Sequence, residues 1–571
     1  MEIQKGSEIQ PLKDHGEVPA TRWLPLAAVA LCLAVAVGYC AAKRGYFVDE
    51  VWSYGYANSH YARVLSDTRG GDLSGATLTR RDLLDYVSVG EGERMDVGSV
   101  LHNQEGDLHP PLFGLALNAA SSLAPGTWSK WAGLGLNLAC HAVALVALWA
   151  LLRELGCSPA ASACGVALWG LSRAGLSDVL YIRMYEMLTA LTVLLALELA
   201  ALMRRGASGG ARRLLPAAVG ATVFLGLMTQ YYFAIYAFLA CLAAGTHLLR
   251  RRRLAEAGAL AACALAGVGL FLLAWPAALA HLGAHNSTSN VSGEDALNRL
   301  VDLAAWPERF SLFGSYIVRD MAVAIAWILS TRIAAHLERR KTPATMTERE
   351  STSPAIVAIL VPAPIVIILI IIIAPYFSPR YLYSSCPLIA VAAALSLDAW
   401  FRRTPEGQRH RKVMFVTGTT AAVLLLFCVV MGPMHLGDDE YAQRKTMAPY
   451  AADPCVYLIK REHTDPGWAN LSITADMPQL MEFEDVHVET DPASAGIAAY
   501  LASKGDPDEV VLYVDVFGTT SDQVGTTSDQ AGEGTAREVA GRLGYSRCTY
   551  VKGYSGADDE YNSSETYLLR R

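Results

Sequence analysis

The chain has 571 residues, of which 53% are hydrophobic and 18% are charged. Its many long apolar runs are typical of a polytopic helical membrane protein, and the alternating ten-residue segments of a membrane β-barrel are missing. Charge is divided unevenly: residues 433–571 contain 24 acidic and 11 basic residues, whereas residues 1–432 carry a net charge of +6. A tail this acidic argues against nucleic acid as a partner.

Residues 1–23 form a polar segment that we expect to be a cytoplasmic tail, and residues 24–432 form the predicted transmembrane domain. We expect about eleven transmembrane helices, because eleven apolar runs are long enough or nearly long enough to cross a bilayer. The runs are Leu24–Ala42, Trp131–Leu152, Cys157–Leu171, Met184–Met203, Leu214–Thr229, Tyr231–Leu249, Ala257–Leu279, Leu312–Thr331, Ile356–Tyr376, Tyr381–Trp400 and Val413–Met431.

Basic clusters set the expected orientation. Each strong cluster follows an even-numbered run, as do Arg250–Arg253 after the sixth and Arg402–Lys412 after the tenth. Because Lys and Arg are enriched in cytoplasmic loops, the N-terminus is predicted to be cytoplasmic and residues 433–571 extracytoplasmic. We therefore expect an integral protein of the cell membrane. Within the first outer loop, residues 43–130, the apolar segment Pro111–Leu123 is too short to span and is predicted to be an interfacial helix.

The first candidate site is Asp49-Glu50, which comes directly after the first apolar run. Carboxylates at the edge of the hydrocarbon region are costly and are functional candidates for that reason. A positioned carboxylate can act as a general base. The alternative is a solvated acidic pair beside the membrane.

Two further motifs lie on the same predicted outer side. The string Asp107-Leu108-His109-Pro110-Pro111-Leu112 follows in the first loop, and the segment from Ser177 to Glu186 opens the fourth run. His109 is suited to bind phosphate or substrate, but a structural role fits equally well. The second motif offers Asp178 or Glu186 as a second acidic residue of the site, with interfacial anchoring by its Tyr and Arg side chains as the alternative.

The fourth motif, Phe377-Ser378-Pro379-Arg380-Tyr381, is a short turn between two apolar runs. An arginine at this depth can bind a lipid phosphate through two parallel hydrogen bonds, or it can reach out to lipid headgroups. The pair Arg319-Asp320 in the eighth run is either an intramembrane ion pair or lies near the outer end, and it receives no role.

The tail, residues 433–571, alternates strand-like and helix-like patterns and is predicted to form a small α/β domain. Val456–Ile459, Val486–Val488, Val510–Phe517, Cys548–Val551 and Thr566–Leu569 are the expected strands. Ala493–Ser503 and Thr535–Leu543 are the expected helices. Cys455 and Cys548 could form a disulfide or remain two free thiols.

Together, an acidic pair after the first helix, His-Pro-Pro-Leu in the first loop, an Arg-x-Tyr pattern before the fourth helix and a late Arg-Tyr resemble the GT-C superfamily of membrane glycosyltransferases. The protein O-mannosyltransferases and the aminoarabinose transferases that modify lipid A (glycosyltransferase family 39-like enzymes) carry similar motifs. The resemblance implies Asp49 as the base, with Glu50 supporting it. It implies a donor phosphate site of Arg380, Arg183 and Tyr381, and substrate contacts from Asp107, His109, Asp178, Tyr185 and Glu186.

The predicted function is inverting transfer of a sugar from a polyprenyl-phosphate donor to an extracytoplasmic protein, lipid or cell-envelope glycan. Its expected partners are the donor lipid, the acceptor and the surrounding membrane lipids. No cofactor is required in the mannosyltransferase-like branch, and a divalent metal stays open. A lipid flippase or transporter and a catalytically inactive scaffold of the same fold are the alternatives. The sequence leaves the sugar, the acceptor and the oligomeric state undetermined.

Overall fold

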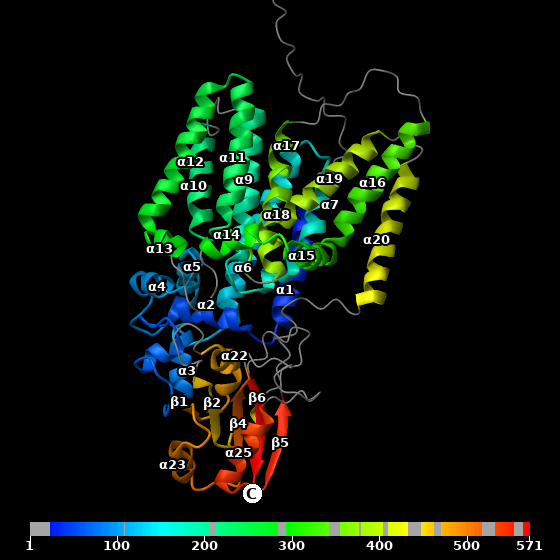
Figure 1. Cartoon of the computed structure of the whole chain (residues 1–571). Coiled ribbons are helices and arrows are strands. Elements are labelled where there is room, and N and C mark those ends of the chain that lie inside the picture. Colours follow the sequence, from blue (N-terminus) through cyan, green and yellow to red (C-terminus); the bar gives the residue numbers. More distant parts are fainter. Residues whose placement is uncertain are drawn as a thin grey trace, which may run out of the picture.

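The computed structural model describes residues 23–107, 109–205, 213–283, 293–341, 354–375, 378–403, 409–431, 447–461, 470–516, 532–552 and 564–571. The predicted cytoplasmic tail lies outside these residues except for Trp23. The described chain divides between a bundle of apolar helices and a mixed sheet at one end of it (Figure 1).

The bundle contains most of the helices. They are α1 (Leu24–Ala42), α6 (Lys130–Glu154), α7 (Pro159–Gly170), α8 (Arg173–Leu180), α9 (Tyr185–Arg205), α10 (Leu215–Leu227), α11 (Phe233–Arg250), α12 (Leu254–Ala274), α13 (Ala277–Gly283), α14 (Gly293–Val301), α15 (Trp306–Asp320), α16 (Ala322–Lys341), α17 (Pro354–Leu360), α18 (Pro362–Ile373), the 3₁₀ helix η4 (Pro379–Ser385), α19 (Cys386–Arg402) and α20 (Arg409–Met431).

Seven stretches of the described chain are helical, long and apolar enough to cross a membrane, or eight if a bent pair counts as one span. The protein is thus a helical membrane protein, but the expected count of eleven spans is not confirmed. The predicted eighth run, Leu312–Thr331, is one reason. It breaks between α15 and α16, which meet at 87°. At the bend, the Asp320 carboxylate forms ion pairs with Arg319 at 2.8 Å and with Arg173 at 3.4 Å. Asp320 is the last residue of α15, so the Arg319-Asp320 pair lies at a helix end.

The loop between α1 and α6 contains several short helices and one strand. It contains α2 (Val48–Asn58), η2 (Leu65–Arg69), strand β1 (Thr77–Thr79), α3 (Arg80–Val87), α4 (Val97–Gln104) and α5 (Leu112–Ser121). Helix α5 begins directly after Pro111 and has ten residues, which agrees with the expected short helix in this loop. Helix α2 lies between the bundle and the sheet (Figure 1) and packs against α22 (Leu471–Leu480) of the tail.

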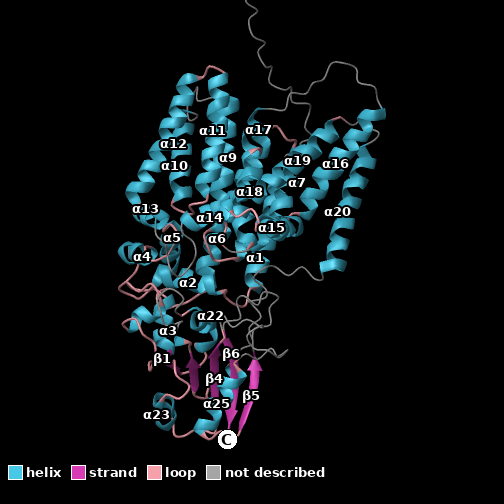
Figure 2. Cartoon of the chain, in the orientation of Figure 1, coloured by secondary structure: helices cyan, strands magenta, loops and turns pink. Residues whose placement is uncertain are grey.

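The remaining elements form the tail. They are η6 (Ala448–Tyr450), β2 (Cys455–Leu458), α22 (Leu471–Leu480), β3 (Asp485–Glu489), α23 (Ala495–Ser503), β4 (Glu509–Asp515), α25 (Glu533–Leu543), β5 (Arg547–Lys552) and β6 (Ser564–Arg570). All five expected strands and both expected helices are present at nearly the expected positions. Figure 2 shows that the strands gather in one sheet below the helices. The predicted α/β architecture of the tail is therefore confirmed, with α22 as an additional helix.

The sheet is not made by the tail alone. Its order is β1-β3-β2-β4-β6-β5, with β3, β2 and β4 parallel and the other pairs antiparallel. Strand β1 comes from the first loop and pairs with β3, Thr77 opposite His487. A second link joins the same two regions: the Asn470 side chain accepts a hydrogen bond from the Ser66 amide at 3.0 Å and donates one to the Ser66 hydroxyl at 3.2 Å. The tail is therefore fastened to the loop that carries Asp49.

The strand order also decides between the two alternatives for the tail cysteines. Cys455 lies in β2 and Cys548 in β5, and strands β4 and β6 lie between them. Neighbouring strands are about 4.8 Å apart, so three steps separate the two residues by roughly 14 Å. A disulfide requires Cα atoms within about 7 Å. Both cysteines are free thiols.

Candidate functional site

Helix α2 brings Asp49 and Glu50 into the site through a capping box. Phe47 is extended, with φ −76° and ψ 153°, and the Glu50 side chain accepts a hydrogen bond from the Phe47 amide at 2.7 Å. The two acidic side chains occupy the first turn, where the positive end of the helix dipole favours negative charge. Helix α2 therefore begins at Val48, and adjacent carboxylates point in different directions from its first turn.

The Glu50 carboxylate is fully occupied by structural partners. It lies 3.0 Å from the Lys43 ammonium, and it accepts a hydrogen bond from the Ile182 amide at 2.8 Å in addition to that from Phe47. Its side chain has no exposed surface. Glu50 thus joins α2 to the end of α1 and to the segment after α8, which fits the expected supporting position.

Asp49 lies at the centre of the site. Its Oδ2 atom lies 2.6 Å from Nη1 of Arg380 and accepts a hydrogen bond of 2.6 Å from the Tyr181 hydroxyl. Arg183 donates to the Asp49 backbone carbonyl at 3.2 Å. Burial alone would raise the pKa of Asp49, but the charges of Arg380 and Arg183 and the Tyr181 hydrogen bond outweigh burial and hold this pKa below its usual range. Asp49 is therefore a buried, ionised carboxylate.

Arg380 enters this site from η4, in the short segment that precedes α19. Its guanidinium lies 5.9, 5.5 and 5.6 Å from the ring centres of Phe47, Tyr181 and Tyr381, close enough for cation–π attraction. It also donates a hydrogen bond to the Tyr181 hydroxyl. The positive charge is thus held by one carboxylate and an aromatic cage, and Tyr181 contacts both members of the ion pair.

The second arginine has a related setting. Burial would lower the pKa of Arg183, but the carboxylates of Asp49 and Asp107 raise it above its ordinary value. Asp107 lies 3.0 Å from Nδ1 of His109 and accepts a hydrogen bond from Gln104 at 3.2 Å. Since the Asp107 carboxylate acts on Arg183, the first-loop motif belongs to the same electrostatic neighbourhood.

Asp178 and Glu186 form a different cluster. Thr189 donates a hydrogen bond to Asp178 at 2.6 Å, and His141 of α6 lies 3.0 Å from the Glu186 carboxylate. Asp178, Glu186 and His141 are completely buried among α6, α8 and α9. None of the hydrogen bonds or ion pairs found among the described residues joins this cluster to Asp49, so the role of the two acids in substrate binding stays a prediction.

Close packing against α6 fixes the segment that carries Tyr181 and Arg183. A Cβ atom on Gly133 would lie 2.1 Å from the Ile182 side chain and 3.0 Å from the Tyr54 hydroxyl, so only glycine allows α6 to approach this closely. Asn137 of α6 donates hydrogen bonds to the Val179 and Tyr181 carbonyls at 3.1 and 2.7 Å. Helix α6 thus holds the backbone that presents Tyr181 to Asp49 at two points, Gly133 and Asn137.

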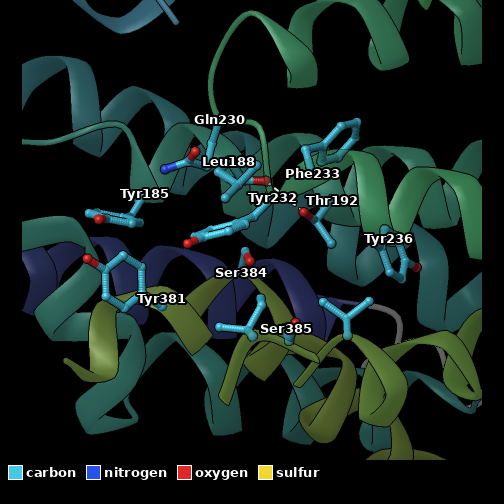
Figure 3. A pocket seen from close by; sticks show the side chains of 12 residues that line it. Tyr185, Leu188, Thr192, Gln230, Tyr232, Phe233, Tyr236, Tyr381, Ser384 and Ser385 are labelled. Atoms are coloured by element: carbon cyan, nitrogen blue, oxygen red, sulfur yellow. Dashed lines mark hydrogen bonds between the residues drawn. The ribbon is translucent and has the colours of Figure 1, made fainter. Parts of the chain in front are cut away.

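A pocket is lined in part by Tyr185 and Tyr381 (Figure 3), and Tyr381 directly follows Arg380 in the chain. Tyr185 stacks near Tyr181, with ring centres 5.9 Å apart, and Tyr381 meets Tyr185 and Tyr232 edge to face. The pocket has a free volume of about 10 Å³, which is space for about one water molecule. It is lined by Tyr185, Leu188, Thr192, Gln230, Tyr232, Phe233, Tyr236, Val366, Ile370, Tyr381, Ser384 and Ser385.

The sequence motifs identified most of this arrangement but not all of it. Asp49, Arg183, Arg380, Tyr381, Tyr185, Asp107 and His109 come together as expected from four separate segments. The sequence motifs predict no role for Tyr181 or Lys43, although Tyr181 lies within the Ser177–Glu186 motif. Among the described residues no group of three or more His, Cys, Asp and Glu side chains is placed to hold a metal ion.

Comparisons with known proteins find similar solved structures but no similar curated sequence. No protein-family model and no curated protein matches the sequence. ArnT from Cupriavidus metallidurans bound to undecaprenyl phosphate is similar, with 12% identity and a TM-score of 0.46 over 96% of this chain and 98% of that one. Its apo structure gives 14% identity and a TM-score of 0.45 over 95% of this chain and 98% of that one.

The oligosaccharyltransferase AglB from Archaeoglobus fulgidus, in complex with an inhibitory peptide and a dolichol-phosphate, gives 11% identity and a TM-score of 0.42, covering 87% of this chain and 70% of that one. ArnT and AglB are GT-C glycosyltransferases, the superfamily that the sequence motifs resemble. Because every TM-score is below 0.5, function must be argued from the site itself.

Proposed function

We propose that this protein is an inverting membrane glycosyltransferase that moves a sugar from a polyprenyl-phosphate donor to an acceptor hydroxyl. The observation that carries the proposal is the buried Asp49–Arg380 pair at the end of an apolar helix bundle. A carboxylate can take the acceptor proton, and an arginine beside it can bind the phosphate that leaves.

The proposed reaction is a direct displacement at C1 of the donor sugar. The acceptor oxygen attacks C1 of the sugar, and its proton passes to the Asp49 carboxylate. The bond between C1 and the phosphate oxygen breaks, and its electron pair leaves with the oxygen to give polyprenyl phosphate. Arg380, with Arg183 behind Asp49, stabilises the charge that builds up on that oxygen. Attack from the face opposite the leaving phosphate inverts the configuration at C1.

The proposed orientation puts this site outside the cytoplasm. The basic clusters after the even-numbered runs favour a cytoplasmic N-terminus, and the tail shares its sheet with the loop that carries Asp49. An acceptor would then approach from the extracytoplasmic side, while the donor lipid would enter from the bilayer. The cell membrane is the proposed location.

The pocket beside Tyr381 supports an uncharged donor sugar. Eight of its twelve lining residues carry a hydroxyl or amide group, and none of the twelve carries a formal charge. Aromatic faces and hydroxyl groups recognise neutral sugars, whereas an amino or acidic sugar needs a counter-ion in a buried site. A ring can enter once Tyr232 and Tyr381, which now meet edge to face, separate.

The test is transfer by the purified protein in nanodiscs, supplied with radiolabelled polyprenyl-phosphate donors that carry a neutral hexose, a neutral pentose, an aminopentose or a uronic acid. Expected is turnover of a neutral-sugar donor, measured as label that leaves the lipid phase. Asp49→Asn should abolish it, and Asp398→Asn, far from Arg380 at the other end of α19, should not. Lipid binding without turnover of any donor would overturn the proposal.

A further inference from the structure

Two negatively charged groups compete for Arg380: the Asp49 carboxylate and the phosphate of the donor. In the proposed reaction it binds the donor phosphate, but in the structure its Nη1 atom is held by the Asp49 carboxylate at 2.6 Å. A phosphate group offers oxygen atoms that match the guanidinium fork and carries negative charge of its own. When the phosphate arrives, it competes for the same donor atoms.

Tyr181 contacts both sides of this pair. Its hydroxyl donates a hydrogen bond to Asp49 Oδ2 and accepts one from Arg380. It lies at the end of α8, where the Asn137 side chain holds its carbonyl and Glu50 holds the next amide. Tyr181 therefore keeps its place when Arg380 moves, because none of these backbone contacts involves η4.

We propose that the donor phosphate draws Arg380 away from Asp49 and so frees the carboxylate to act as a base, while Tyr181 stays bonded to Asp49 as a positioning residue. This rests on the proposed glycosyl transfer and adds an order to it: the base becomes available only after the donor has bound. A hydroxyl that reaches the site first meets a carboxylate still neutralised by Arg380.

The electrostatics around Asp49 agree with this order. Four groups act on it: Arg380 from η4, Arg183 and the Tyr181 hydroxyl from the segment between α8 and α9, and His109 of the first loop. Of these, Arg380 has the largest effect, and together they keep the pKa of Asp49 low despite burial. Burial raises the pKa of Asp49, and Arg380 counteracts this effect. When Arg380 moves away, the pKa of Asp49 rises and its carboxylate becomes a stronger base. Arg183 remains, since it binds the Asp49 carbonyl and the Ser53 hydroxyl.

The first experiment tests the exchange without any turnover. A polyprenyl phosphate that carries no sugar is added to the protein in nanodiscs, and infrared difference spectra follow the carboxylate bands of isotope-labelled aspartate. A shifted band in wild type that is absent from Asp49→Asn is the expected result. Phosphate binding that leaves every aspartate band unchanged would overturn the exchange, whether or not the protein transfers sugar.

The second experiment tests Tyr181. In Tyr181→Phe, we expect a tenfold or greater fall in kcat, donor affinity within about twofold of wild type, and an acid limb of the kcat profile shifted to higher pH. In wild type, the hydrogen bond from Tyr181 lowers the pKa of Asp49. Loss of this bond raises the pKa, so the carboxylate becomes protonated at a higher pH. The profile is repeated in His109→Gln as a control for this neighbouring side chain.

The matched control is Tyr54→Phe. Tyr54 is equally buried and donates its hydroxyl to the Ser129 carbonyl at 2.7 Å, but it makes no hydrogen bond to Asp49. We expect this variant to lose some stability and to keep the wild-type pH profile. If Tyr181→Phe keeps the wild-type kcat and profile, Tyr181 has no positioning role. If wild type turns over no donor while the infrared band shifts, the exchange stands and the proposed function fails.

Discussion

The ion pair between Asp49 and Arg380 should be measurable as a coupling free energy. Both side chains are more than four-fifths buried, with 12% and 14% of their surface exposed, and their closest atoms are 2.6 Å apart. Two unit charges about 4 Å apart attract by about 4 kcal/mol at an effective dielectric constant of about 20. The cost of burying them offsets part of this. We expect a coupling free energy of about 2 kcal/mol.

The assay is a double-mutant cycle of Asp49→Asn and Arg380→Gln, with free energies of unfolding from SDS titrations in mixed micelles. Each single variant should lose about 3 kcal/mol, because it leaves one buried charge without its partner, and the double variant should lose less than the sum. The exposed pair Arg81–Asp85, at 2.8 Å, is the control and should couple by under about 0.5 kcal/mol. Coupling at the buried pair no larger than this control would refute the reasoning.

Three further predictions concern residues around the site and in the tail. Glu50→Gln should lower the free energy of unfolding by at least about 2 kcal/mol while donor affinity in the folded fraction is kept. Adding Lys43→Met should restore part of the loss, because it removes the buried ammonium group that Glu50 neutralises in wild type. Alkylation of the unfolded, unreduced protein followed by mass spectrometry should find Cys455 and Cys548 both modified; a disulfide-linked peptide would contradict the sheet order. Asn470→Ala should weaken the tail–loop contact by about 1–2 kcal/mol and increase proteolysis of the tail, whereas an unchanged digestion rate would show that this side chain contributes little.

Local sequence patterns were sufficient for elements whose physics is local. The apolar runs of α1 and α9, the α/β alternation of the tail and the start of α5 after Pro111 were all predicted at close to their observed positions. These features depend on residue polarity and spacing within a short window. The motifs also identified Asp49 and Arg380, because charged residues next to apolar runs stand out.

The features that were missed depend on contacts between distant segments. Strand β1 has three residues and no strong pattern, and it exists because β3 offers it an edge. At the bend, Asp320 forms an ion pair with Arg173, which is remote in sequence. Likewise, Tyr181 has no local signal that separates it from an interfacial tyrosine, and its position between Asp49 and Arg380 appears only when α2, α8 and η4 come together.

The most direct test of the account is a single-turnover measurement with a neutral-sugar polyprenyl-phosphate donor, comparing wild type with Asp49→Asn. If Asp49 is the base, the variant should bind the donor at least as tightly as wild type does, because no carboxylate then competes with the phosphate for Arg380. It should transfer sugar at least about 100-fold more slowly, a loss of about 2.7 kcal/mol of transition-state stabilisation. Transfer by Asp49→Asn at the wild-type rate would contradict the account.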